Sequence, residues 1–261
     1  MEKLLIHGQR PLCGQVSING AKNAALAIIA ASLLADDIVT LENIPDIDDI
    51  KNLVMVLEKM NVRTTYLDKH TLRIDSRYMN NDCADSENVR KMRASYYLLG
   101  ALLGRFKCAR VAFPGGCDFG VRPIDQHIKG FQALGADVDA KGIISIQARE
   151  LRGANIFLDM VTVGATINIM LAAVLAKGTT VIENAAKEPH VVDTASFLNS
   201  LGANIKGAGT DVIRIKGVQK LHGSTYAIIP DQIEAGTYMV AAAITKGDIT
   251  VKNVIPRHME A

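Results

Sequence analysis

The sequence contains little of what marks a nucleic-acid-binding protein. Tryptophan is absent, and aromatic residues make up 5% of the 261 residues. The 29 lysines and arginines are nearly balanced by 27 acidic residues, which gives a net charge of +2. Proteins that bind nucleic acid gather basic residues in blocks, often with aromatic residues between them, and neither pattern occurs here. We therefore expect no nucleic-acid partner.

Cysteine is also scarce. The four cysteines, Cys13, Cys83, Cys108 and Cys117, are far apart and form neither a CxxC motif nor a cysteine–histidine cluster. A disulfide framework or a zinc site would need closer, patterned spacings. We expect free thiols in a reducing cytoplasm, with the first three unreactive, and neither a metal nor a cofactor.

Long apolar runs are missing as well. The longest covers residues 24–35 and is interrupted only by Ser32. A membrane-spanning helix needs about 20 apolar residues, so this run predicts a buried helix. Residues 1–8 break off too soon to form the apolar core of a signal peptide. Since 49% of the residues are hydrophobic, we expect a cytoplasmic protein with a sizeable core and no membrane segment.

The sequence does contain an internal repeat. Three segments share an apolar helix end, a tight polar turn and a β-branched strand that closes with asparagine: 34–43, 175–184 and 244–253. Asn43 and Asn184 are 141 positions apart, and Asn184 and Asn253 are 69 apart. A fainter copy at 103–113 lies midway in the longer interval. A fixed period of about seventy residues indicates repeated supersecondary units.

Each complete unit continues with a second helix and further strands. The second helices are predicted at 50–60, 124–134 and 192–201. Gly135 and Gly202 stand where helix C-caps favour glycine. The strands that follow are predicted at 137–140 with 143–147, and at 204–206 with 212–216. The Gly-Ala-Gly at 207–209 is followed by no helix, so we interpret it as a turn and not as a nucleotide loop.

One predicted helix in each unit is apolar on nearly all sides, at 24–35, 97–103 and 165–176. Such helices must be buried. The sequence therefore predicts an inside-out α/β fold of repeated βαβαβ-like units, with the helices at the centre and the sheets outside. A fourth unit begins at Ile233 and stops at Ala261 after one helix and one strand. A unit that stops there cannot bury its faces, so we expect a truncated chain.

Residues 114–123 combine a glycine-rich loop, Pro-Gly-Gly-Cys, with an arginine. Glycines permit a mobile loop, and the guanidinium of Arg122 would lower the pKa of the Cys117 thiol. Together they suggest a lid that closes over a negatively charged substrate. A glycine–proline hairpin with an incidental cysteine explains the loop alone equally well.

Several motifs together resemble the enolpyruvyl transferases, most closely those with a UDP-sugar acceptor. They are Gly-Ala-Lys-Asn-Ala-Ala-Leu at 20–26, Met-Arg-Ala-Ser at 92–95, the Cys117 loop through Asp125, Val-Gly-Ala-Thr at 163–166, and Pro-Asp-Gln-Ile-Glu-Ala-Gly-Thr at 230–237. The resemblance covers essentially the whole sequence. It implies a catalytic domain of three repeats at 21–229. Residues 1–20 and 230–261 would then form part of a second, incomplete domain.

The resemblance also implies a reaction. The family members in question transfer the enolpyruvyl group of phosphoenolpyruvate to the 3-hydroxyl of UDP-N-acetylglucosamine and release phosphate, the first committed step of peptidoglycan synthesis. By the same resemblance Lys22 and Arg122 hold phosphoenolpyruvate, and Asn23 orients the reacting groups. A phosphate and a carboxylate call for converging cations, and Lys22 precedes a buried helix whose free N–H groups favour anions.

Further site residues follow from the same resemblance. Cys117 corresponds to the proton donor, which also forms a covalent adduct and is the target of fosfomycin. The UDP-sugar site would consist of Arg93, Arg122, Pro123, Ile124, Asp125, Gln126, Val161, Thr162, Val163 and Gly164. Two positions depart from the family pattern: Met160 replaces a lysine that some members have, and Gln232 replaces a common arginine.

Two other hypotheses remain open. One is a non-catalytic, UDP-sugar-binding truncated paralogue; the other is an EPSP synthase, which the Cys117 loop argues against. The family takes a catalytic aspartate and another arginine from beyond residue 261, so we expect the isolated 261 residues to turn over negligibly. Two features that could suggest a functional role have simpler structural explanations. His127 is predicted to be a packed helix residue and not a site residue. Asp46, Asp48 and Asp49 are predicted to lie at a helix start and not to bind a metal.

Overall fold

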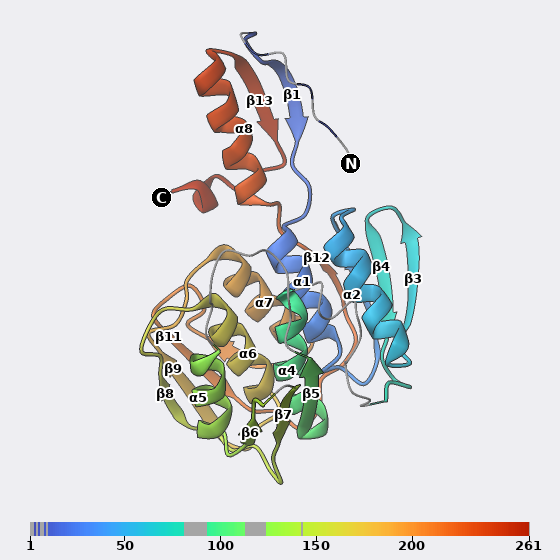
Figure 1. Cartoon of the computed structure of the whole chain (residues 1–261), viewed down its shortest axis with the longest axis vertical. Helices are drawn as coiled ribbons and strands as arrows, with labels where there is room; N and C mark the ends of the chain where they lie inside the picture. Colours follow the sequence, from blue (N-terminus) through green and yellow to red (C-terminus); the bar gives the residue numbers. More distant parts are fainter. Residues whose placement is uncertain are drawn as a thin grey trace.

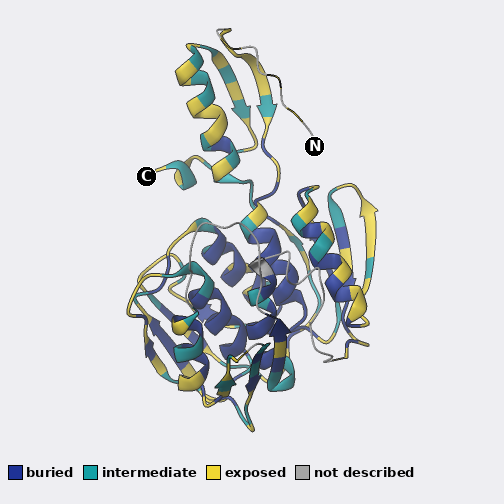
Figure 2. Ribbon diagram, viewed as in Figure 1, coloured by how far each residue is buried: buried dark blue, intermediate teal, exposed yellow. Residues whose placement is uncertain are grey.

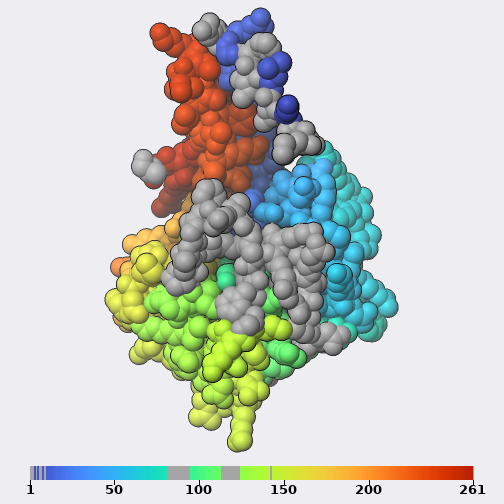
Figure 3. Space-filling view, viewed as in Figure 1, coloured from blue at the N-terminus to red at the C-terminus, as the bar shows by residue number. Residues whose placement is uncertain are grey.

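The computed structural model describes residues 3, 5, 8, 10–80, 93–112, 124–141 and 143–260. Figure 1 shows a large body of helices wrapped by sheets, with a smaller part above it that holds both described ends of the chain. Figure 3 shows the red surface of the C-terminal segment at the opposite end of the molecule from the green surface of the middle segment.

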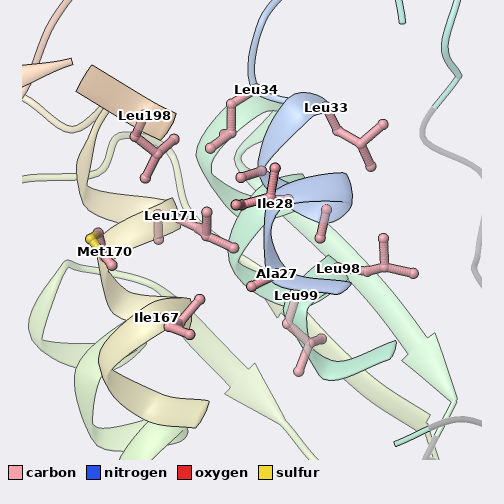
Figure 4. Packing of buried hydrophobic residues seen from close by; sticks show 14 of the residues in the cluster. Ala27, Ile28, Leu33, Leu34, Leu98, Leu99, Ile167, Met170, Leu171 and Leu198 are labelled. Carbon is pink, nitrogen blue, oxygen red and sulfur yellow. The ribbon is translucent and has the colours of Figure 1, made fainter. Parts of the chain in front are cut away.

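Three apolar helices form the centre of the large body. They are α1 (Lys22–Ser32), α4 (Tyr97–Phe106) and α6 (Val163–Ala173). Their side chains point toward one another in Figure 4, where Ile28, Leu99 and Leu171 represent one helix each. These three side chains are fully or almost fully buried. This confirms the predicted inside-out fold with buried central helices.

Two glycines let α4 and α6 pack closely. A Cβ atom on Gly100 would lie 2.4 Å from the Asn168 carbonyl oxygen, and one on Gly104 would lie 2.8 Å from the Leu171 carbonyl oxygen. The Gly100 N–H also donates to Oδ1 of the buried Asn168 at 2.9 Å. The close approach explains how the helices can be apolar on all sides and still satisfy a polar group between them.

Within the described residues, three sheets and three amphipathic helices surround this centre. The first unit has β2 (Ile38–Glu42), α2 (Asp48–Lys59), β3 (Arg63–Asp68) and β4 (Thr71–Asp75). The second has β5 (Cys108–Ala112), α5 (Asp125–Ala133), β6 (Asp137–Asp139) and β7 (Ile143–Gln147). The third has β8 (Asn155–Phe157), β9 (Thr179–Glu183), α7 (Pro189–Ser200), β10 (Asn204–Lys206) and β11 (Val212–Lys216). The strand orders are β12-β2-β4-β3, in which β12 is Thr225–Ala227, then β5-β7-β6 and β10-β11-β9-β8.

The sequence period is a structural period. The repeated strands β2, β5, β9 and β13 begin at Ile38, Cys108, Thr179 and Asp248, which are 70, 71 and 69 residues apart. Gly135 and Gly202 follow α5 and α7 with φ of 91° and 98°, as predicted for helix ends. The predicted start of the third amphipathic helix at residue 192 was wrong by three residues. Helix α7 begins at Pro189, because proline suits the first helical turn.

The asparagine that closes three of the four repeats has one structural role. Asn43, Asn184 and Asn253 adopt left-handed backbone conformations, with φ of 58°, 58° and 56°. Each side-chain amide donates to the carbonyl that follows the neighbouring parallel strand. The acceptors are, in order, Ile228, Leu158 and Ile18, at 2.8, 2.8 and 2.7 Å. Asparagine therefore suits each position for two reasons: it tolerates the left-handed backbone conformation, and its side chain supplies the hydrogen-bond donor.

Two strands are exchanged between the two parts of the molecule. In the third unit, β8 precedes α6 and pairs in parallel with β9, which follows α6. The strand before α1 is β1 (Cys13–Ser17), yet it pairs with β13 (Asp248–Lys252) in the smaller part. The strand before α8 (Gln232–Thr245) is β12 (Thr225–Ala227), yet it pairs with β2 in the large body. Because of this exchange, two linkers connect the parts: residues 18–21 join β1 to α1, and residues 228–231 join β12 to α8.

Helix α8 resembles the central helices in sequence but not in burial. Its apolar residues include Val240 and Ile244, which are 65% and 78% exposed, and Figure 2 shows it mostly yellow and teal beside the dark blue central helices. Within the described residues, none of the helices has the length and apolar character needed to span a membrane.

Candidate active site

Two of the predicted phosphoenolpyruvate-binding residues, Lys22 and Asn23, lie next to the crossing of the two linkers, and the third, Arg122, lies outside the described residues. Gly20 and Pro230 form an antiparallel bridge. It is flanked by hydrogen bonds from the Ala21 N–H to the Ile229 carbonyl oxygen at 2.8 Å and from the Asp231 N–H to the Asn19 carbonyl oxygen at 2.9 Å. A Cβ atom on Gly20 would lie 1.7 Å from the backbone oxygen of Asn43. Only glycine fits there, and Lys22 begins α1 two residues later.

Asp231 caps two helices with one carboxylate. Its Oδ2 accepts the backbone N–H of Lys22, the first residue of α1, at 3.0 Å. Its Oδ1 accepts the N–H groups of Ile233 and Glu234, in the first turn of α8, at 2.8 and 3.1 Å. In the sequence analysis Asp231 was only one residue of the motif at 230–237. Its partner Lys22 is 209 positions away, so no local pattern could have indicated a shared cap.

The side chain of Lys22 already has an ionic partner. Its Nζ lies 2.7 Å from Oδ2 of Asp49, in the first turn of α2, and both side chains remain substantially exposed. Asn23 follows on α1 and is partly buried. An anion that bound Lys22 would therefore meet a cation that Asp49 already neutralises in part. The predicted placement of Asp49 at a helix start is confirmed, and its pairing with Lys22 is an addition.

The predicted UDP-sugar residues that the structure describes form a second group. Asp125 and Gln126 begin α5, immediately after the partly buried Ile124. Val161 and Thr162 end a turn that leads from β8 to α6, and Val163 and Gly164 are the first residues of α6. The two stretches are neighbours, because a Cβ atom on Gly164 would lie 2.9 Å from Nε2 of His127 on α5.

His127 is a packed helix residue, as predicted. It is buried, and its ring centroid lies 5.9 Å from that of Tyr96. Tyr96 belongs to the 3-10 helix η1 (Arg93–Tyr96), which leads into α4. This contact brings η1, and with it the backbone of Arg93, next to the second group. The side chain of Arg93 lies outside the described residues, as do Cys117, Arg122 and Pro123.

A buried carboxyl group lies beneath one linker. Asp193 on α7 accepts the hydroxyl of Tyr226 at 2.6 Å and the N–H of Ile229 at 3.4 Å. Burial raises its pKa to about 6, against the lowering effect of these hydrogen bonds. Nearby on α7, burial lowers the pKa of His190, although Glu188 and Asp231 act in the opposite direction. Only Asp193 lies within the helix predicted at 192–201, and no local pattern singled out either residue.

A hollow of about 520 Å³ lies on the first unit, between the start of α2 and β3. Its lining includes Ile47, Ile50, Tyr66 and the lysines 51 and 69. None of the predicted site residues that the structure describes lines it.

Comparison with known proteins identifies a family over nearly the whole chain. The family model described as EPSP synthase (3-phosphoshikimate 1-carboxyvinyltransferase) matches residues 6–261. A curated UDP-N-acetylglucosamine 1-carboxyvinyltransferase from Clostridium botulinum is 58% identical over 263 residues, which cover 100% of this chain and 63% of the relative. One from Caldanaerobacter subterraneus is 57% identical over 262 residues, with the same two coverages. The chain thus spans less than two thirds of the length of these relatives.

Solved structures agree on the fold. The enolpyruvyl transferase NikO from Streptomyces tendae superposes with a TM-score of 0.77 at 25% identity, over 90% of this chain and 56% of that one. The EPSP synthase from Acinetobacter baumannii superposes with a TM-score of 0.73 at 21% identity, over 95% and 57% of the two chains.

Proposed function

The chain belongs to the EPSP synthase (3-phosphoshikimate 1-carboxyvinyltransferase) family, and from that membership we propose that the protein is a UDP-N-acetylglucosamine 1-carboxyvinyltransferase. It would transfer the enolpyruvyl group of phosphoenolpyruvate to the 3-hydroxyl of UDP-N-acetylglucosamine. The observation that carries the proposal is the identity of 58% with proteins of that name along the entire chain. The EPSP synthase from Acinetobacter baumannii, by contrast, is 21% identical.

The reaction first requires a proton on the methylene carbon of phosphoenolpyruvate and attack of the sugar hydroxyl, which loses its own proton, on the adjacent carbon. Phosphate then departs as a proton is removed from the new methyl group, which restores the double bond. In this proposal Lys22, Asn23 and Arg122 hold phosphoenolpyruvate, and Cys117 donates the proton. The geometry at Lys22 supports its role, because a cation stands at the start of a buried helix, beside the crossing of the two linkers. Cys117 would also be the nucleophile that fosfomycin alkylates.

The UDP-sugar would occupy the region formed by Arg93, residues 122–126 and residues 161–164. The contact between His127 and Gly164, which joins α5 to the start of α6, supports this placement. Residues 21–229 would be the catalytic domain, and 1–20 with 230–261 would belong to the second domain. The protein would work in the cytoplasm, in cell-wall synthesis, and so contribute to cell shape and division.

Ligand binding and turnover can be tested separately. We expect the 261-residue chain to bind UDP-N-acetylglucosamine in calorimetric titrations, because all residues of the proposed UDP-sugar site belong to this chain. We expect negligible phosphate release from the same chain with phosphoenolpyruvate added, because it spans 63% of the relatives' length. Substantial release would contradict this expectation. A protein from the complete reading frame that bound the sugar but never released phosphate would favour the non-catalytic alternative.

The role of Cys117 has its own test. We expect fosfomycin to add its mass once to the protein, and the Cys117→Ser variant to remain unlabelled in intact-mass spectrometry. Cys13→Ser is the matched control, because Cys13 is an exposed free thiol and its loss should leave labelling unchanged. An undiminished adduct in Cys117→Ser would remove the thiol from the mechanism.

A further inference from the structure

We propose that Gln126, Asp159 and Lys129 form a clasp that positions the turn of residues 160–163 for the nucleotide sugar. Their side chains act on the ligand through that turn and, for Gln126, through the carboxylate of Asp125, and not by direct contact. The proposal rests on the proposed UDP-sugar site and assigns positioning roles within it. It concerns two residues that the sequence did not single out, Asp159 and Lys129, and one that it placed in the site, Gln126.

The side chain of Gln126 is fully engaged by the protein itself. Its carbonyl Oε1 accepts the backbone N–H of Asp159 at 2.9 Å. Its amide Nε2 donates to Oδ2 of Asp159 at 3.1 Å and to Oδ2 of Asp125 at 2.8 Å. The partners fix the orientation of the amide, because a backbone donor must meet the oxygen and carboxylates must meet the nitrogen. Both amide hydrogens are used and Gln126 is only 5% exposed, which leaves no donor for a ligand.

Asp159 is held at both carboxylate oxygens. Lys129 donates to its Oδ1 at 2.7 Å, and Gln126 donates to its Oδ2. The hydrogen bonds from Lys129 and Gln126 lower the pKa of Asp159, so it remains a carboxylate at neutral pH. The Lys129 and Asp159 side chains are 42% and 62% exposed, so their ion pair alone contributes little. The buried Gln126, with three hydrogen bonds, provides most of the attachment.

The clasp sets the path of the turn together with one further attachment. Leu158 donates its N–H to the Glu183 carbonyl at 3.0 Å and accepts the Asn184 side-chain amide at 2.8 Å, which ties it to β9. The next residue, Asp159, is tied to α5 by the clasp. Met160 and Val161 follow, each 55% exposed, and α6 begins at Val163.

Consecutive residues are therefore fastened to a sheet and to a neighbouring helix just before the proposed contact residues. The same Gln126 amide also orients the carboxylate of Asp125, which belongs to the proposed nucleotide site. One side chain thus sets the geometry between Asp125 and the start of α6. A change at Gln126 should move both parts of the site without removing any group that touches the ligand.

The test compares two glutamines on one helix. Gln126→Glu keeps the size of the side chain but replaces both donors and places a third carboxylate beside Asp125 and Asp159. Gln132→Glu makes the same change at an exposed position of α5. We expect the Kd for UDP-N-acetylglucosamine, measured by calorimetry on the 261-residue chain, to rise at least tenfold in Gln126→Glu and to stay within twofold of wild type in Gln132→Glu.

Two exposed variants cover the case in which Gln126→Glu fails to fold. We expect Asp159→Ala to weaken binding about threefold to tenfold and Lys129→Met by less than threefold, with thermal unfolding midpoints close to wild type in both. Addition of Asp159→Ala to Gln126→Ala should weaken binding little further, because residues that act as a unit are not additive. A purely structural effect would instead lower the unfolding midpoint in step with affinity.

The outcomes separate this inference from the proposed function. If wild type binds and Gln126→Glu or Asp159→Ala binds equally well, the clasp is overturned and the proposed function stands. If folded wild type fails to bind UDP-N-acetylglucosamine, the proposed sugar site is overturned and the clasp falls with it. Independent, additive effects of Gln126 and Asp159 would also overturn the clasp.

Discussion

At the scale of single residues, Asp193 links the stability of the fold to pH. It is a buried carboxyl group that contacts the hydroxyl of Tyr226 and the backbone of linker residue Ile229. Its pKa is raised by burial from 3.8 to about 6. Between these two values the folded state binds a proton that the unfolded state does not. The contribution of Asp193 to stability is therefore present at low pH and is lost as the pH rises toward 6 and beyond.

The Asp193→Asn variant should remove this dependence. We expect the free energy of unfolding of wild type, relative to the variant, to fall by at most about 3 kcal/mol between pH 4 and pH 7, since one pKa unit corresponds to about 1.4 kcal/mol. Urea denaturation of both proteins across this range measures the difference and cancels the other titrating groups. A difference that stayed constant, or rose with pH, would show that the pKa of Asp193 is not raised in the folded protein.

The sequence could predict the role of a residue where that role depends on residues close to it in the chain. Asp193 is not such a residue. The position of Lys22 before an apolar run was enough to place a cation at the start of a buried helix, which the structure confirms. The burial of Asp193 depends on Tyr226, which is 33 positions away. The pairing of Lys22 with Asp49 depends likewise on the approach of two separate helices. Such contacts are consequences of packing, and a local pattern does not contain them.

At the scale of elements, the repeat was predictable because its signals are local. The apolar helix, the turn and the β-branched strand all fall within a short window, and the terminal asparagine belongs to the same window. The pairing of the strands could not be predicted in this way. Nothing near β1 indicates that it joins β13 and not β2, because that choice is made by linkers more than two hundred residues apart.

The asparagine that closes three of the four repeats contributes a hydrogen bond and a left-handed backbone conformation, and the two contributions can be separated at Asn184. Asn184→Gly keeps the left-handed conformation and loses the hydrogen bond to the Leu158 carbonyl, so we expect a loss of about 1 kcal/mol in the free energy of unfolding. Asn184→Ala loses the hydrogen bond and also strains the backbone, so we expect a further loss of about 1 kcal/mol. Urea denaturation measures both. Equal stability of the two variants would show that backbone conformation contributes nothing at this position.

At the scale of the whole molecule, the described residues join the two parts through a polar crossing of the linkers. Asp231 lies at its centre, because it caps α1 of one part and α8 of the other. Glu234 adds a second connection by accepting the backbone N–H and side-chain amide of Asn19 at 2.9 and 3.0 Å. The relative position of the parts, and with it the position of Lys22, therefore depends on a few hydrogen bonds at this crossing.

The two capping roles of Asp231 should separate in a serine variant. A carboxylate has two oxygens and here uses Oδ1 for α8 and Oδ2 for Lys22, whereas a serine hydroxyl at the same place can cap only the adjacent helix α8. We expect Asp231→Ser to retain the slow amide exchange of Glu234 and to accelerate that of Lys22 roughly five- to thirtyfold, the equivalent of one to two kcal/mol. Asp231→Ala should accelerate both, and hydrogen exchange followed by NMR distinguishes the two patterns.

If the Lys22 amide stayed protected in Asp231→Ser, its protection would come from the linker bridge alone. The carboxylate would then have no part in holding the two parts together, because the bond from Lys22 is the only one it accepts from the large body among the described residues.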